Sequence, residues 1–337
     1  MLFLLLCFFT VGFALTGCSG PKREVIKLSG HVFGTTWHIT TYSQKKITQR
    51  REKKLIAAIN QQLDSINQSM STYLPNSELN QFNKAQINTW FEASNDLIQC
   101  LLIAQKVSEK TDGAFDITIS PLVDLWGFGP EIKTLEVPPG SELEAALKRV
   151  NYRALEISEN RIQKTAEIEV DLSAVAKGYA VDKVAEVMKQ HKFDNFLAEI
   201  GGEVKVAGKS PRGDDWRLGV EAPSGEVGQA QRAIAITDVA VATSGDYRNY
   251  FEQGGQRYSH TISPITGMPI THILASITVI ADNTAMADAL ATGLNVMGPE
   301  AALALAEKTD LAVYLILKTE SGFKELHSSA FTPYLTQ

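Results

Sequence analysis

The chain has 337 residues, of which 44% are hydrophobic and 21% charged, the proportions of an ordinary globular protein with ample apolar material for a core. Its formal net charge of −6 argues against non-specific nucleic-acid binding, which depends on basic patches. Beyond the N-terminus no stretch approaches about 18 uninterrupted apolar residues, so the sequence predicts no membrane-spanning helix within the body.

The N-terminal run MLFLLLCFFTVGFAL is short and strongly apolar, which is typical of a secretory signal rather than of a fold element. The Leu-Thr-Gly-Cys run that ends at Cys18 resembles the lipobox of bacterial lipoproteins, in which the cysteine becomes the acylated first residue. We therefore expect a lipoprotein signal peptide at 1–17, a tether at 18–30 and the globular body at 31–337. A signal anchor, or a cleaved signal with an incidental cysteine, is the alternative.

Cysteine usage agrees with this division. Cys7 lies in the signal and Cys18 would carry lipid, so the body holds Cys100 alone, within an apolar stretch. We predict that Cys100 is a buried small hydrophobic residue, which argues against cysteine-based zinc binding or nucleophilic catalysis.

In the first half of the body, aromatic and β-branched residues predict a strand at 31–42. Apolar residues recur at helical spacing from Leu55 to Met70, with charge on the other face, and predict a helix over about 48–70. The other elements expected here are a helix at 95–110, a long surface loop at 127–141 and a short helix at 142–150.

The second half alternates strands and helices. A short strand at 168–172 is expected to enter a helix at 173–191, and helices are also expected at 284–297 and 299–308, before two final strands. The remaining strands are expected near 194–200, 203–208, 216–221, 232–237, 257–262 and 274–281. Many strands are joined by short turns, which favours an α+β fold with antiparallel sheet over a doubly wound parallel sheet.

The strongest candidate site is the run Ala-Asp-Ala-Leu-Ala-Thr at 287–292. Asp288 and Thr292 are four residues apart on a predicted helix, so both side chains project from one face. A carboxylate beside a hydroxyl is a pair of hard oxygens that Mg²⁺ accepts. The same pair also occurs on solvated helices, but this helix is apolar nearly all round, and a buried carboxylate needs a partner.

A second candidate is the run Val-Asp-Leu-Ser-Ala-Val-Ala-Lys-Gly-Tyr at 170–179. Here a predicted strand delivers Asp171 and Ser173 to a helix N-terminus, where free N–H groups and the helix dipole favour a bound anion. Plain capping of the helix by either side chain is the alternative.

Three further segments have suitable chemistry. His260 stands at the end of a predicted strand before a Pro/Gly turn, where it could act as a general base, although a lone histidine is more often simply packed or solvated. The segment 111–128 brings together aromatics and glycines suited to a flat ring system, or to an ordinary turn and core. The pair Gly201-Gly202 allows close backbone approach to a ligand, or forms a hairpin.

Together these segments resemble the ApbE family, the flavin-trafficking proteins that act as FAD:protein FMN transferases. The most specific matches are the Asp-Leu-Ser-Ala-Val-Ala-Lys-Gly-Tyr run at 171–179 and the Ala-Asp-Ala-Leu-Ala-Thr run at 287–292. The other matching segments are 33–37, 70–73, 111–116, 200–203, 216–220, 242–247 and 260–267. They span essentially the whole body.

The resemblance implies an α+β body with a duplicated T-fold-like architecture, antiparallel sheets and packed helices. It implies that Mg²⁺ is held by the side chains of Asp288 and Thr292 and by the backbone carbonyl of Ala174, and that His260 and Asp288 carry the catalysis. Positions that touch FAD in relatives are Phe33, Tyr73, Ala114, Phe115, Asp116, Asp171, Lys177 and Ile262. Phe33 stands where many relatives have methionine, and Ser263 stands where they often have aspartate.

The implied reaction is cleavage of the FAD pyrophosphate, with FMN passing to a serine or threonine of an acceptor flavoprotein. Two alternatives remain at this point: an FAD pyrophosphatase that releases FMN and AMP, and a non-enzymatic FAD-binding lipoprotein. We expect the protein on the bacterial periplasmic side, lipid-anchored to the inner or outer membrane, where subunits of respiratory complexes are within reach as acceptors.

Overall fold

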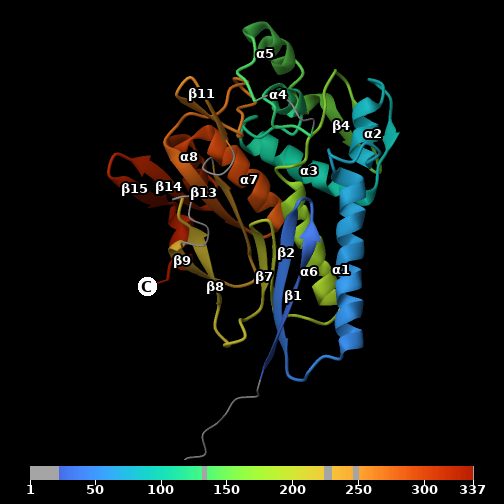
Figure 1. The fold of residues 1–337 in the computed structure, drawn as a ribbon, viewed down its shortest axis with the longest axis vertical. Coiled ribbons are helices and arrows are strands. Elements are labelled where there is room, and N and C mark those ends of the chain that lie inside the picture. The colour runs from blue at the N-terminus through green and yellow to red at the C-terminus, as the bar shows by residue number, and fades with distance from the viewer. Residues whose placement is uncertain (1–22, 131–134, 224–229, 246–249, 337) are drawn as a thin grey trace, which may run out of the picture.

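An eight-stranded antiparallel sheet forms the centre of the molecule (Figure 1). The structure is a computed structural model that describes residues 23–130, 135–223, 230–245 and 250–336. In spatial order the strands are β1 (Glu24–Val32), β2 (Thr35–Ser43), β6 (Phe196–Ile200), β7 (Glu203–Ala207), β10 (Ala240–Gly245), β13 (Leu274–Ala281), β14 (Ala312–Thr319) and β15 (Gly322–His327).

The sheet consists of two four-stranded halves that follow the same plan. In each half a strand pair is followed along the chain by helices and then by a second strand pair: β1 and β2 before β6 and β7, then β10 and β13 before β14 and β15. The halves join where β7 and β10 pair antiparallel, with Lys205 opposite Ala240 and Val204 opposite Val241. The expected α+β class, with antiparallel sheets and packed helices, is confirmed.

Helices α1 (Gln49–Met70), α6 (Ala176–Gln190) and α7 (Thr284–Met297) pack side by side over the sheet, α6 lying against both others (Figure 1). The predicted apolar face of α1, from Leu55 to Met70, is buried in the main core. Helix α8 (Pro299–Lys308) follows α7 and covers β14. Helix α1 places its apolar face against the core, as an amphipathic pattern requires, whereas α7 is buried along most of its length.

A second core lies on the opposite face of the sheet. The hairpin of β8 (Trp216–Glu221) and β9 (Ala230–Ile236) packs there with a C-terminal 3₁₀ segment, Ser329–Tyr334. Tyr314 stacks on Phe331 with ring centroids 5.4 Å apart. Both faces of the central strands are therefore buried.

The remaining elements gather at one end of the sheet, the top of Figure 1. They are α2 (Glu78–Lys84), α3 (Asn95–Lys110), α4 (Ser120–Leu125), α5 (Gly140–Leu147), the sheet of β3 (Phe91–Glu92), β5 (Arg161–Lys164) and β4 (Leu155–Ser158), the 3₁₀ turn Tyr152–Ala154, and the hairpin of β11 (Tyr250–Gln253) and β12 (Gln256–Ser259). Cys100 is fully buried in α3, and burial raises the pKa of its thiol.

Several segments differ from the sequence expectation, two of them at the edge of the body and before α6. Strand β1 begins at Glu24, inside the expected tether, because Ile26 and Leu28 alternate with polar residues and enter the core. Residues 168–172 form only an isolated bridge, between Glu169 and Ile119. The polar backbone groups there are satisfied by other partners: the N–H of Asp171 donates to the carbonyl of Ile117 at 2.7 Å.

The predicted signal peptide at 1–17 and Cys18 lie outside the described residues. Within the part that the structure describes, no helix has the length and apolarity needed to cross a bilayer.

Candidate active site

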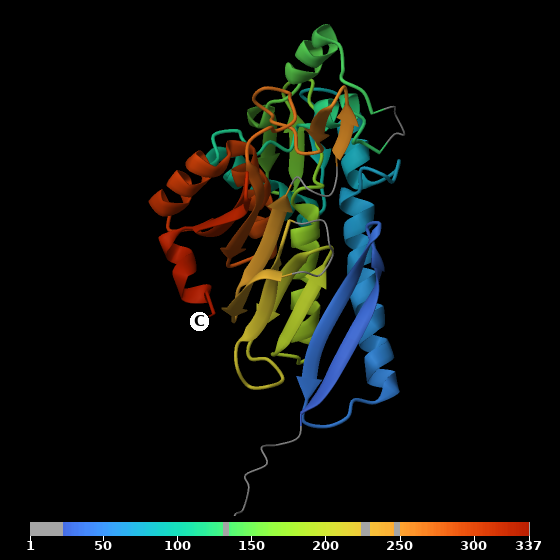
Figure 2. The ribbon, with the colours of Figure 1, turned by 60° about the vertical axis from the view of Figure 1, so that its left-hand side comes forward.

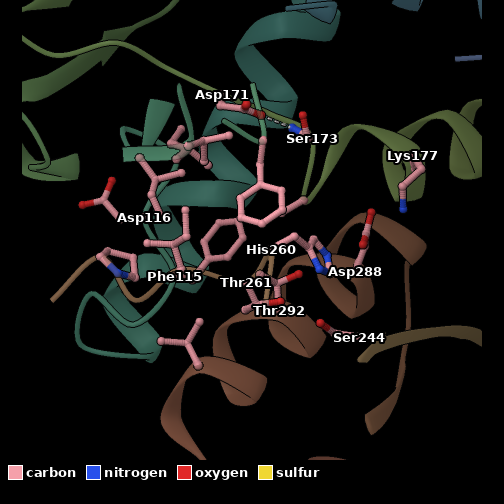
Figure 3. A pocket seen from close by; sticks show the side chains of 18 of the residues that line it. Phe115, Asp116, Asp171, Ser173, Lys177, Ser244, His260, Thr261, Asp288 and Thr292 are labelled. Atoms are coloured by element: carbon pink, nitrogen blue, oxygen red, sulfur yellow. Dashed lines mark hydrogen bonds between the residues drawn. The ribbon is translucent and has the colours of Figure 1, made fainter. Parts of the chain in front are cut away.

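A pocket of about 490 Å³ opens where the end of the sheet meets α6, α7 and the elements above them (Figure 3). Its lining comes from both halves of the molecule. The predicted site residues that line it are Tyr73, Ala114, Phe115, Asp116, Asp171, Ala174, Lys177, His260, Ile262, Asp288 and Thr292. Segments far apart in the sequence thus meet in one cavity.

Asp288 and Thr292 lie one turn apart on α7 and both line the pocket. Asp288 is 6% exposed, and its Oδ2 accepts a hydrogen bond from the backbone N–H of Gly178 at 3.0 Å. Helix α7 is held at its start by Asp182 of α6, whose carboxylate accepts from the N–H groups of Thr284 and Ala285 at 2.8 and 2.9 Å. Contacts from α6 therefore set the position of the Asp288 carboxylate.

Ala174 lies in the turn that leads into α6 and also lines the pocket. Oδ1 of Asp171 accepts from the N–H of Ser173 at 2.6 Å and holds this turn (Figure 3). Helix capping by Asp171 or Ser173, the alternative from the sequence, is wrong: the N-cap of α6 is Val175, without a side-chain hydrogen bond. Asp171 instead holds the preceding turn and faces the cavity. Helix α6 begins at Ala176, three residues later than expected.

These residues fit the implied metal ion. The set offers a carboxylate, a hydroxyl and a backbone carbonyl, all hard oxygen donors of the kind that Mg²⁺ takes. The second oxygen of Asp288 and the hydroxyl of Thr292 make no hydrogen bond to other described residues. A cluster of three or more His, Cys, Asp or Glu side chains able to hold a metal is absent from the described chain, so any ion here would draw several ligands from substrate or water.

Glu203 is a pocket residue that the sequence reasoning did not single out. Its Oε1 accepts from Nζ of Lys177 at 2.7 Å, while its buried Oε2 has no hydrogen-bond partner among the described residues. Burial lowers the pKa of Lys177, but the negative charges of Asp288 and Glu203 outweigh it and raise that pKa above its usual value. The Lys177 ammonium therefore stays charged beside the cavity.

Burial also acts on the partner carboxyl and raises the pKa of Glu203 to about 7, against the opposing effect of Lys177. The charge of Asp288 adds to the upward shift. The signal that could have found Glu203 is its place directly after Gly201-Gly202, at the start of a buried strand. A carboxylate at the start of a buried strand is shielded from solvent.

An aromatic and apolar wall closes another side of the pocket. Phe115 and Ile262 are buried, and Phe128, which the sequence reasoning had placed in a ring-binding segment, meets the ring of His260 edge-on at 6.4 Å. Tyr73 is 68% exposed at the pocket rim, directly after the end of α1. A flat ring could lie against this wall.

Asp116 lines the pocket, but its carboxylate is committed to the protein. Oδ1 accepts from the N–H and the hydroxyl of Thr118, both at 2.7 Å, and Oδ2 accepts from the N–H of Tyr152 at 2.9 Å. Burial raises the pKa of Asp116, although these hydrogen bonds oppose the shift. Asp116 is therefore placed to hold the loop that carries Phe115.

Phe33 lies in the turn between β1 and β2 with a φ of 51°, and it is not among the described residues that line the pocket. The FAD contact expected for it stays a prediction. Pocket residues beyond the prediction also include Thr243, Ser244 and Thr261, which come from the two segments on either side of the β11–β12 hairpin.

Comparison with known proteins shows which family the chain resembles. The sequence model of the ApbE family matches residues 33–315. The FAD:protein FMN transferase of Vibrio cholerae serotype O1 is 42% identical over 324 residues, which cover 96% of each chain. That of Haemophilus influenzae is 42% identical over 327 residues, covering 94% of this chain and 93% of its own. The solved flavin transferase ApbE from Vibrio cholerae has a TM-score of 0.86 and 41% identity, and its whole length covers 93% of this chain.

Proposed function

This chain belongs to the ApbE family, and we propose that its pocket binds FAD with one Mg²⁺ and uses His260 to activate a hydroxyl of an acceptor protein. Its enzyme class is that of its relatives: it is an FAD:protein FMN transferase. The observation that carries the proposal is the convergence of Asp288, Thr292, Ala174 and His260 on a single cavity.

The reaction balances with the groups at hand. A serine or threonine oxygen of the acceptor forms a bond to the FMN phosphorus of FAD, and the bond from that phosphorus to the bridging oxygen breaks, so that AMP leaves. His260 accepts the hydroxyl proton as general base. Bound Mg²⁺ would neutralise pyrophosphate charge and make AMP a better leaving group.

The other residues bind and orient. Lys177, kept cationic by Glu203 and Asp288, lies where it can contact a phosphate oxygen. Phe115, Phe128 and Ile262 provide apolar surface for the isoalloxazine ring and exclude water from that side of the cavity. Transfer and hydrolysis share all these residues and differ only in the nucleophile.

The test is incubation of the protein with FAD, Mg²⁺ and a candidate acceptor, followed by in-gel flavin fluorescence of the acceptor. We expect Asp288→Ala, or EDTA, to reduce the signal by about 100-fold or more, since metal stabilisation of the transition state is worth several kcal/mol. The control is Glu144→Ala on the exposed face of α5, which should leave the signal unchanged.

Other outcomes identify the alternatives. Release of FMN and AMP without labelled acceptor would indicate a pyrophosphatase, and tight FAD binding without AMP would indicate a carrier. If neither EDTA nor Asp288→Ala reduced the signal, the metal assignment would be wrong.

We also propose that Cys18 carries lipid and holds the enzyme on the periplasmic side of the inner or outer membrane, near acceptors such as respiratory flavoprotein subunits. Support comes from the Leu-Thr-Gly-Cys run and from the start of β1 at Glu24, only a few residues later. Metabolic labelling with a radioactive fatty acid should mark the natural chain and not Cys18→Ser. Equal labelling of both would contradict the proposal.

A further inference from the structure

Six cationic side chains crowd one end of the molecule. Lys45 and Lys46 lie in the loop before α1, and the others lie in its first turns: Arg50, Arg51, Lys53 and Lys54. We call these six residues the basic cluster. All six are exposed, and Glu52 is the one acidic residue between positions 45 and 54. The whole chain has a net charge of −6, so the charge of this cluster is opposite in sign to that of the chain as a whole.

The fold does not account for the basic cluster. Their side chains make no ion pair with a described carboxylate, and among them only that of Arg51 has a hydrogen bond or ring contact within the described chain, donating to the carbonyl of His191 at 3.1 Å and lying 4.9 Å from the ring centre of Phe193. Cations at a helix N-terminus also oppose the helix dipole, which favours negative charge there. Their placement therefore points to a binding role.

The basic cluster lies beside the start of the described chain. Glu24, the first residue of β1, pairs with Ser43, and the cluster begins two residues after Ser43. Figures 1 and 2 both show the start of β1 and the start of α1 at the same lower end of the molecule. Five residues lie between Cys18 and Glu24 along the sequence, so the two are at most about 20 Å apart at full extension.

The pocket lies at the other end of α1. This helix has 22 residues, so it is about 33 Å long. Thr72 and Tyr73, which follow it, line the pocket. Helix α1 therefore separates the basic cluster from the catalytic cavity.

We infer that the basic cluster docks on the anionic surface of a phospholipid bilayer and holds the pocket about 30 Å away from it, open to acceptor proteins. The inference deepens the proposed anchoring at Cys18. A lipid fixes the chain to a bilayer without deciding which face of the body meets it, and the cluster supplies that orientation. Charge complementarity, and the proposed lipid anchor, which only five residues separate from β1, select a bilayer as the occupant.

The test uses the body without the proposed signal and lipid, residues 23–337; the whole solved Vibrio cholerae relative covers 93% of this chain. The protein is sedimented with vesicles of phosphatidylcholine alone or with about 30% phosphatidylglycerol. Binding is expected only to the anionic vesicles, and it should fall about tenfold or more between 0.05 and 0.5 M NaCl as screening increases.

The decisive variant combines Lys45→Gln, Lys46→Gln, Lys53→Gln and Lys54→Gln, which leaves Arg51 and its contacts in place. Vesicle binding should fall by about 100-fold or more, since each cation near an anionic surface contributes about fivefold. The matched control removes four exposed cations elsewhere, through Lys110→Gln, Lys148→Gln, Lys308→Gln and Lys324→Gln. It should retain most of the binding.

The orientation of the protein on the bilayer can be measured separately. Cys100 is the single cysteine of residues 23–337 and is buried, so an introduced surface thiol can be labelled selectively. A fluorophore at Gln44→Cys should transfer energy to a labelled lipid strongly, and one at Asn76→Cys, near the pocket end, weakly.

Absence of binding to anionic vesicles, equal loss in both quadruple variants, or equal energy transfer from both labels would each overturn the inference. FMN transfer measured without vesicles should be unchanged in both quadruple variants. Loss of transfer activity in the natural chain with vesicle binding intact would refute the proposed function and leave the docking surface standing.

Discussion

Among single residues, the contact between Lys177 and Glu203 shows how burial and charge act against each other in this pocket. Glu203 keeps 5% of its side chain exposed and Lys177 keeps 33%, on the side of the cavity. Removing one member of a buried pair leaves the other charge uncompensated, whereas a neutral side chain of the same shape is often tolerated. Substitution of Glu203 and substitution of Lys177 should therefore change the stability of the protein differently.

This contact predicts a pH dependence. In the folded protein Glu203 holds its proton up to about pH 7, whereas in the unfolded chain it releases it near 4.5. The folded state then binds more protons between these values, so this residue makes stability fall as pH rises from 4.5 to 7, with no further change above. The melting temperature of Glu203→Gln, relative to that of the natural protein at the same pH, should therefore be higher at pH 8 than at pH 5.

The control for this comparison is Glu144→Gln on exposed α5, whose melting temperature should follow the natural protein at both pH values. A constant difference between Glu203→Gln and the natural protein across this range would show that Glu203 titrates normally.

Among elements, the packing of α6 on α7 decides where the carboxylate of the site lies. Gly178 of α6 stands against α7 so closely that a Cβ added to it would lie 2.4 Å from the carbonyl oxygen of Thr284 and 2.8 Å from Cβ of Asp288. Glycine here permits the approach that also forms the hydrogen bond from its N–H to Asp288.

Gly178→Ala should force the two helices apart. We expect a loss of about 1–3 kcal/mol in the free energy of unfolding, and FAD affinity should fall with it because Asp288 moves. Denaturant unfolding and FAD titration measure the two effects. Gly140→Ala at the start of α5 is the control, since nothing lies within 4 Å of its added Cβ. Unaltered FAD binding by Gly178→Ala would show that the helix contact does not position the site.

At the scale of the whole molecule, the pocket joins the two halves of the duplicated sheet. The halves share only a short stretch of pairing between β7 and β10, whereas the cavity takes side chains from α6 in one half and α7 in the other. A ligand bound there contacts both halves at once. Binding should therefore stabilise the body as a unit.

FAD with Mg²⁺ is expected to raise the melting temperature. At a ligand concentration about 100 times the dissociation constant, the gain is about 2.7 kcal/mol, or about 4 °C for a protein of this size. Differential scanning fluorimetry read through tryptophan emission would measure it. Asp288→Ala should lose the part of the shift that depends on Mg²⁺. An EDTA-sensitive shift in this variant as large as that of the natural protein would contradict the metal assignment.

Much of the local structure follows from the sequence because it depends on neighbouring residues. The 3.6-residue period from Leu55 to Met70 predicted α1, and the same reasoning placed Asp288 and Thr292 on one face of α7. Strand β10 was not predicted, because Ala240–Gly245 ends in Thr, Ser and Gly and has no alternation. Its first three residues, Ala240 to Ala242, are all buried, so the strand needs no alternation of apolar and polar residues there.

Sequence by itself determined the family, since the Asp-Leu-Ser-Ala-Val-Ala-Lys-Gly-Tyr and Ala-Asp-Ala-Leu-Ala-Thr runs are specific to it. Only the tertiary structure decided which groups meet. Gly178 and Asp288 are 110 residues apart, and they touch because two apolar helix faces bury against one sheet. The partnership of Glu203 with Lys177, and the separation of the basic cluster from the pocket by α1, likewise arise from packing. Local spacing does not encode such distances, because they depend on how buried surfaces fit together.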